Sequence, residues 1–302
     1  MKSTILMIRP VSFGFNEQTA GSNAFQVRSS EQLHVQQKAL AEFDTFVDKL
    51  RANGIDVIVI DDTPQPHTPD SIFPNNWVSF HEDGKVFLYP MQADNRRLER
   101  RPEIIERLKN NFNITEVDDL SNFEQHNKFL EGTGSMVLDR PNKIAYACLS
   151  PRTDIEVMNA FCKKSGYSPV YFHAVDSNGM AIYHTNVLMC IGEKFVVICL
   201  DTIRDEQEKE ALIEMFRQTG KEVIEISLHQ MNAFAGNMLE LVNDKGEHLL
   251  VMSARAYHSL TLLQIETLEQ YCTLIYSDLT VIENNGGGSA RCMMAEVYLP
   301  LK

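Results

Sequence analysis

The sequence has no apolar run long enough to cross a membrane, although 44% of its 302 residues are hydrophobic. A transmembrane helix needs about 20 consecutive, mostly apolar residues. The N-terminal stretch MKSTILMIRP is interrupted by Arg9 and Pro10, so its apolar part is too short for a secretory signal. We therefore expect a cytoplasmic protein without a membrane partner, in which this stretch forms a buried first strand.

Metal and nucleotide motifs are missing as well. The six cysteines form no CxxC pair and have no spacing with histidine that is typical of zinc. We expect them to be free thiols in a reducing compartment. Neither GxGxxG nor GxxxxGK[ST] follows a predicted strand, and GGGS at 286–289 precedes a short C-terminal strand instead of a helix. The sequence therefore predicts a protein without a metal or organic cofactor.

Positive charge is scarce, because 28 Lys and Arg residues face 41 Asp and Glu residues, for a net charge of −13. Such a surface repels the phosphate backbone of nucleic acids and anionic lipids. We expect no nucleic-acid partner and favour a small polar molecule as the ligand.

No Pro-, Gly- or Ser-rich linker divides the chain, so we expect one domain over residues 1–302. Apolar residues at helical spacing predict helices at Glu31–Ala52, Arg97–Asn111, Asp154–Ser165, Asp205–Gln218 and Leu260–Tyr271. Short apolar runs between them predict strands: IDVIVI, KVFLY, NVLMCIG, FVVICL, KEVIEI, HLLVM and CTLIYS.

The order strand, strand, helix, strand returns about every 50–60 residues, a period that suggests a circular array of supersecondary units. Five such units would fit the 302 residues and could close a ring. The alternative is an ordinary doubly wound α/β sheet, which also alternates strands and helices. Periodicity alone does not decide between these two α/β folds.

Three segments place reactive side chains beside tight turns. Cys292 follows the glycine-rich turn in NNGGGSARCMM, where missing side chains let the backbone approach a ligand closely. His184 stands at the entrance to the apolar run of AIYHTNVLMCIG, and Glu131 opens the turn of LEGTGSMVL. Taken singly, a small buried cysteine, a buried or capping histidine and an ordinary turn explain each segment equally well.

A fourth segment, TPDSIFPNNWVSF, combines polar side chains with the only tryptophan of the chain. A few polar groups among apolar side chains are typical of small-ligand pockets. The candidate ligand-binding residues here are Asp70, Asn75 and Asn76. A surface turn is the alternative.

Together the four segments resemble the guanidine-modifying (pentein) superfamily, which includes arginine deiminases, dimethylarginine dimethylaminohydrolases, amidinotransferases and citrulline-utilisation hydrolases, the last being most similar. In that superfamily an acidic turn, a histidine before a strand and a cysteine near the C-terminus occur in this order, as do Glu131, His184 and Cys292. The resemblance extends to Arg152 in ACLSPRTD, which matches an arginine that holds the substrate carboxylate, and to Arg96 in DNRR, which matches a paired-arginine segment.

The resemblance implies a pseudo-fivefold α/β-propeller (pentein) of ββαβ units and a hydrolase that acts without cofactor on a small amino-acid substrate. Cys292 would attack the ureido or guanidino carbon, with protonated His184 stabilising the thiolate and then protonating the departing amine. Neutral His184 would next activate water, while Glu131 orients the substrate or the imidazole. A homo-oligomer is compatible with this class.

Departures from the superfamily pattern bear on the substrate. Asn75, Asn76 and Asn186 stand where relatives that bind a guanidinium often carry carboxylates, and only Asp70 keeps an acid in this region. An amide can donate to a ureido oxygen and accept from its nitrogens, so a citrulline-like substrate is favoured. The alternative is that the asparagines only preserve the shape of the pocket.

Other functions of the same fold stay open at this point. An arginine deiminase, a dimethylarginine dimethylaminohydrolase or an amidinotransferase would use the same cysteine and histidine. A ribosome-binding factor of this fold would not need the Cys, His and Glu set, so its presence favours an enzyme.

Overall fold

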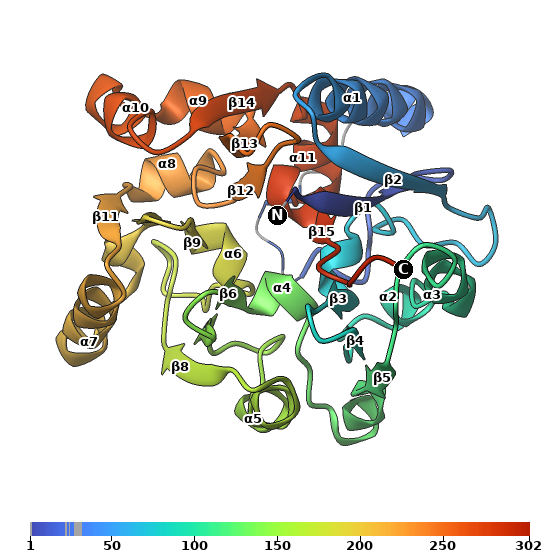
Figure 1. The fold of residues 1–302 in the computed structure, drawn as a ribbon, viewed down its shortest axis with the longest axis horizontal. Coiled ribbons are helices and arrows are strands. Elements are labelled where there is room, and N and C mark those ends of the chain that lie inside the picture. Colours follow the sequence, from blue (N-terminus) through green and yellow to red (C-terminus); the bar gives the residue numbers. More distant parts are fainter. Residues whose placement is uncertain (1, 22, 24, 27–31) are drawn as a thin grey trace.

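The elements of the protein surround a common centre in five three-stranded sheets (Figure 1). The computed structural model describes residues 2–21, 23, 25–26 and 32–302. In each sheet the central strand pairs antiparallel with one neighbour and parallel with the other, and helical segments connect the two parallel strands. This arrangement confirms the pseudo-fivefold ring and excludes the doubly wound sheet.

The first unit is closed by the C-terminal end of the chain. Its parallel strands are β1 (Thr4–Arg9) and β2 (Asp56–Asp61), which are connected by helix α1 (Gln32–Ala52). The third strand, β15 (Ala295–Glu296), pairs antiparallel with β1. The two ends of the sequence therefore meet in one sheet and complete the ring.

The other four units repeat this pattern in sequence order. Their strands are β3 (Val78–Phe80), β4 (Lys85–Leu88) and β5 (Glu116–Asp119); β6 (Val137–Asp139), β7 (Ile144–Cys148) and β8 (Ser168–Phe172); β9 (Met189–Ile191), β10 (Phe195–Ile198) and β11 (Glu222–Glu225); and β12 (Leu239–Val242), β13 (His248–Ser253) and β14 (Thr273–Ser277). Their connecting helices are α2 (Asp94–Arg97), α3 (Pro102–Leu108), α5 (Ile155–Ser165), α7 (Glu206–Gln218), α9 (Ala254–Ser259) and α10 (Leu262–Leu268).

Short helical segments lie near the centre of the ring, mostly before the first strand of a unit (Figure 1). We call the residues directly before β3, β6, β9, β12 and β15 the entry segments; they are residues 74–77, 131–136, 184–188, 235–238 and 289–294. Their turns are η1 (Pro74–Asn76), α4 (Gly132–Ser135), α6 (Thr185–Leu188) and η4 (Ala290–Met293), and α11 (Thr280–Gly286) precedes the last of them.

The sequence-based boundaries hold to within about two residues with three exceptions. The helix predicted at Leu260–Tyr271 is shorter and ends at Leu268. The helix predicted at 97–111 is shorter, because Pro102 starts a separate helix, α3, after α2 has ended at Arg97. The strand predicted from Asn186 begins only at Met189, because Thr185–Leu188 forms a helical turn. Glu31, the predicted start of the first helix, lies outside the described residues. None of the described helices is long and apolar enough to span a bilayer.

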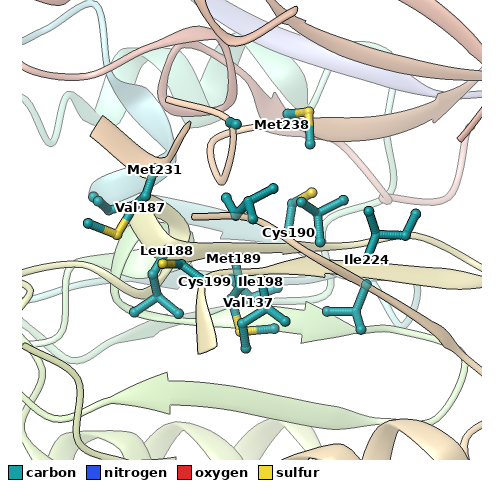
Figure 2. Packing of buried hydrophobic residues seen from close by; sticks show 14 of the residues in the cluster. Val137, Val187, Leu188, Met189, Cys190, Ile198, Cys199, Ile224, Met231 and Met238 are labelled. Atoms are coloured by element: carbon teal, nitrogen blue, oxygen red, sulfur yellow. The ribbon is translucent and has the colours of Figure 1, made fainter. Parts of the chain in front are cut away.

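Neighbouring units share their hydrophobic cores. Phe161 of α5 contacts Phe87 of the preceding unit, with ring centroids 4.9 Å apart, and Phe216 of α7 lies 5.2 Å from the ring of Tyr146. Figure 2 shows the same principle where Val137 of one unit packs against Leu188 and Met189 of the next. Continuous packing between units fixes the positions of the entry segments.

Glycines let these entry segments touch. A Cβ atom on Gly132 would lie 2.3 Å from the carbonyl oxygen of Asn75, and one on Gly236 would lie 2.3 Å from that of Val187. Gly132 also has a φ of +48°, which disfavours other residues. The centre of the ring is therefore packed backbone against backbone.

We expect Gly236→Ala to lower the free energy of unfolding by about 1–3 kcal/mol, because the added methyl group meets backbone atoms that cannot turn aside. Gly14→Ala is the matched control, since a Cβ there meets no atom within 4 Å. Denaturant unfolding of both variants checks this. An equal effect of the two substitutions would show that the centre is less tightly packed than described.

Candidate active site

The entry segments bring polar side chains from all five units to the centre of the ring. Asn76 precedes β3, Glu131 precedes β6, His184 precedes β9, Asn237 precedes β12 and Cys292 precedes β15. Each side chain therefore occupies a comparable place in its unit. The pseudo-fivefold fold thus gathers residues that are far apart in sequence.

A small cavity lies among these segments, with a volume of about 20 Å³. This volume is that of about one water molecule, so the cavity must widen to admit an amino acid. Its walls are Asn23, Asp70, Phe73, Asn76, Arg96, Arg152, Tyr183, His184, Gly286, Gly287, Gly288 and Cys292.

Six of the nine residues singled out from the sequence therefore line one cavity. Of the other three, Glu131 bonds to His184 and Asn186 contacts Cys292. Asn75 does not line the cavity: its Nδ2 donates to Oγ1 of Thr133 at 3.3 Å, which ties two entry segments together.

Glu131 and His184 form a buried pair, with 2.8 Å between Oε2 and Nε2. Burial lowers the pKa of His184 to about 4, even though Glu131 favours the charged form. The pKa of Glu131 is held well below its ordinary value, because Arg152 and His184 together outweigh the effect of burial. Near neutral pH the pair is therefore a neutral imidazole beside a carboxylate, unlike the charged imidazole expected from the sequence.

Arg96 is held in place by partners on several sides. Its Nε and Nη2 donate to the two oxygens of Glu99 at 2.9 and 3.0 Å, and its Nη1 donates to Oδ1 of Asn76 at 2.8 Å. Burial raises the pKa of Glu99 to about 7. Sequence reasoning did not identify Glu99, which follows the paired arginines on the connection between β4 and β5. This network fixes the carboxamide of Asn76 beside the cavity.

Asp70 presents a carboxylate to the same cavity. Its Oδ2 accepts from Nδ2 of Asn16 at 2.7 Å and lies 3.8 Å from Nε of Arg96, whereas its buried Oδ1 has no hydrogen-bond partner among the described residues. Burial raises the pKa of this carboxyl group. The N-terminal loop thus adds Asn16 as a partner of Asp70 and Asn23 as part of the cavity wall.

Asn237 is the residue beside Cys292 that sequence reasoning missed. Its Nδ2 lies 3.3 Å from the sulfur of Cys292, and Nδ2 of Asn186 lies 3.6 Å from the same atom. The available signal was indirect: Gly236-Asn237 stands directly before the first strand of its unit, as Asn76 does in the second unit. Without the repeat register, a Gly-Asn pair reads as an ordinary turn.

Among the described residues, no group of three or more His, Cys, Asp or Glu side chains is placed to hold a metal ion. The chemistry available at the cavity is therefore that of a thiol, an imidazole, carboxylates, guanidinium groups and amides.

Solved structures with the same fold include an arginine dihydrolase and a DDAH. ArgZ, an arginine dihydrolase from the ornithine–ammonia cycle in cyanobacteria, is 17% identical with a TM-score of 0.74; the alignment covers 99% of this chain but only 41% of ArgZ. The N-terminal domain of ArgZ bound to product is 17% identical with a TM-score of 0.75, and the alignment covers 99% of both chains. DDAH from Pseudomonas aeruginosa, as a mutant complexed with citrulline, is 17% identical with a TM-score of 0.66. That alignment covers 98% of this chain and 99% of the DDAH chain. No curated protein sequence matches the chain.

The ring of five α/β units defines the protein as a pentein, the fold of the guanidine-modifying enzymes. More specifically, residues 9–299 match the family model of "N,N dimethylarginine dimethylhydrolase, eukaryotic", and the chain belongs to that family. It is accordingly a hydrolase that acts on non-peptide C–N bonds. Membership of a hydrolase family argues against the non-catalytic alternative.

The depressed pKa of His184 predicts a pH-dependent contribution to stability. Between its ordinary pKa of 6.5 and the folded value of about 4, only the unfolded chain takes up the proton. The contribution is therefore present above pH 6.5 and is lost as the pH falls towards 4.

We expect the unfolding free energy of the wild type, minus that of His184→Gln, to fall by about 1–2 kcal/mol between pH 6.5 and 5. The subtraction cancels the opposite effects of Glu42 and Glu99, whose pKa values burial raises to about 7. Denaturant unfolding at several pH values measures the difference. A difference that is independent of pH would mean that His184 titrates normally.

Proposed function

We propose that this hydrolase cleaves a C–N bond of a ureido or guanidino amino acid, citrulline-like substrates being favoured, through a covalent intermediate on Cys292. The observation that carries the proposal is that Cys292 and His184 line one cavity, with Glu131 bonded to the imidazole at 2.8 Å. Nucleophile, base and orienting group are the three parts that covalent hydrolysis requires.

In the first half-reaction the thiol of Cys292 gives its proton to neutral His184, and the sulfur attacks the central carbon of the substrate. The imidazolium then protonates the nitrogen of the C–N bond that breaks, so that the amine leaves as a neutral molecule. Glu131 stabilises the imidazolium while it exists. The low pKa of His184, about 4, supports this order, because the histidine begins as a base.

In the second half-reaction water attacks the covalent intermediate. Neutral His184 takes a proton from the water, the carbon–sulfur bond breaks, and the proton returns to the sulfur of Cys292. The thiol and the neutral imidazole are thereby restored. One histidine thus serves as base and acid in both half-reactions, and the enzyme neither gains nor loses a proton over the cycle.

Arg152 is proposed to bind the substrate carboxylate. Its guanidinium lies at the cavity, 3.5 Å from Oε2 of Glu131 and 5.0 Å from the ring centre of Tyr183. A planar guanidinium can bind a carboxylate through two parallel hydrogen bonds. Arg96 is already paired with Glu99 and Asn76, so its proposed role is to position the wall of the cavity.

The side-chain amides of Asn76 and Asn186 support a substrate with a neutral ureido head group. Nδ2 of Asn76 and Oδ1 of Asn186 are buried without a hydrogen-bond partner among the described residues. Unmade hydrogen bonds of buried polar groups cost about 1–3 kcal/mol each. A ureido group offers the oxygen and the N–H groups that would satisfy them.

A guanidinium substrate is the second candidate, and one observation favours it. Oδ1 of Asp70 is a buried carboxylate oxygen without a hydrogen-bond partner among the described residues, and it belongs to a residue of the cavity wall. A cationic head group would supply both the missing hydrogen bond and a countercharge. Arginine and methylated arginines belong in the same assays.

We expect Cys292→Ser to lower kcat at least a thousandfold with little change in melting temperature, because the oxygen is a much weaker nucleophile in the same place. Cys162→Ser is the control, since Cys162 lies on the outer helix α5. Substrate depletion and thermal unfolding of both variants measure the effect. Full activity of Cys292→Ser would refute the covalent mechanism.

We expect kcat/KM for citrulline to exceed that for arginine, with ornithine, ammonia and carbon dioxide as products. Asn76→Asp should move the ratio towards arginine by about tenfold, since it places a carboxylate where a charged hydrogen bond to a guanidinium becomes possible. The assay follows ammonia, ornithine, citrulline and dimethylamine with each substrate. Efficient turnover of arginine or dimethylarginine and none of citrulline would establish the second candidate instead.

A further inference from the structure

Two buried carboxamide side chains contact the sulfur of Cys292. Asn237 reaches it with Nδ2 at 3.3 Å and Oδ1 at 3.6 Å, and Asn186 reaches it with Nδ2 at 3.6 Å. Both asparagines are only 1% exposed. They come from two different units of the ring, so the fold as a whole determines how they meet the sulfur.

The orientation of the Asn237 carboxamide is fixed by the backbone at both ends. Its Oδ1 accepts from the backbone N–H of Arg291 at 3.1 Å, and its Nδ2 donates to the carbonyl oxygen of Asn186 at 2.9 Å. A flipped amide would place oxygen against oxygen and N–H against N–H. Since an amide nitrogen carries two hydrogens, the second one is available to the sulfur.

The cationic groups nearby are engaged elsewhere. Arg96 pairs with Glu99, and Arg152 lies 3.5 Å from Oε2 of Glu131. The guanidinium of Arg291 donates to the carbonyl oxygen of Met294 and to Glu296. His184 is neutral near pH 7 because burial lowers its pKa to about 4. A negative sulfur in the substrate-free enzyme must therefore be stabilised mainly by fixed dipoles.

We propose that Asn237 is a catalytic residue whose Nδ2–H donates to the thiolate of Cys292, with Asn186 as the second donor. The inference deepens the proposed function, because it requires Cys292 to be the nucleophile. The same carboxamide serves both states of the sulfur: the thiol donates to Oδ1 at 3.6 Å, and the thiolate accepts from Nδ2 at 3.3 Å.

The donors act twice in each turnover. They stabilise the sulfur as its proton leaves for His184, and again when the carbon–sulfur bond breaks and the electron pair returns to sulfur. Preorganised donors of this kind need no reorientation at the moment of reaction. Loss of Asn237 therefore slows both half-reactions.

Alkylation by iodoacetamide as a function of pH tests the inference without a substrate, because only the thiolate reacts. Peptide mapping identifies the alkylated cysteine. Asn237→Asp keeps the acceptor for Arg291 and replaces the donor that faces the sulfur, Asn237→Ala removes both, and Asn186→Ala removes the second donor. Asn53→Asp, at the end of the outer helix α1, is the matched control.

We expect the midpoint pH of Cys292 alkylation to rise by about one unit or more in Asn237→Ala and further in Asn237→Asp, with at least a tenfold lower alkylation rate below the midpoint. Asn186→Ala should produce a smaller rise and Asn53→Asp none. The kcat of the Asn237 variants should fall in parallel. A merely structural role would lower kcat and the melting temperature without moving the midpoint.

An unchanged midpoint in folded Asn237→Asp and Asn237→Ala overturns the inference while leaving Cys292 as the nucleophile. The proposed function fails in a different way, namely if Cys292→Ser retains turnover. If Asn237→Ala does not fold, Asn237→Asp and Asn237→Ser decide the question, since both keep an oxygen near the N–H group of Arg291.

Discussion

The close approach of the entry segments at the centre of the ring is the constraint on which the site depends. A Cβ atom on Gly134 would lie 2.4 Å from Nδ2 of Asn76 and 2.8 Å from Nδ1 of His184. The chain can bring these side chains together only because nothing projects from position 134. The sheets and outer helices then act as a frame: their shared cores hold five segments at distances that local structure alone could not set.

This close packing also concentrates charge away from water. Arg96, Glu99, Glu131 and Asp70 are each no more than 3% exposed. Burying such groups is costly unless each charge is paired and hydrogen-bonded, and the arginine contacts supply this pairing. The same burial keeps His184 neutral. The electrostatic cost of the site and its chemistry therefore have one origin, namely burial. Burial favours the neutral imidazole, which can act as a base, and it strengthens the interaction of amide dipoles with a charge on the sulfur.

The sequence predicts the parts of this protein that repeat or that carry distinctive chemistry. Apolar runs predicted the longer helices and many of the strands, and their period allowed a ring without deciding for it. The helix predicted at 97–111 is divided because Pro102 begins α3. Cys292, His184 and Glu131 were recognisable from residue type and order. Glu99 and Asn237 were not, since an acid on a helical connection and a Gly-Asn turn have no local signature. Their roles depend on contacts between units, which only the closed ring specifies.

The pseudo-fivefold repeat explains how five units with the same fold contribute different side chains to one site. Each entry segment contributes a group of different chemistry at a comparable place: an amide at Asn76, a carboxylate at Glu131, an imidazole at His184, an amide at Asn237 and a thiol at Cys292. In the proposed mechanism the two asparagines act on different parts of the site, Asn237 on the sulfur of Cys292 and Asn76 on the charge of the substrate that can enter.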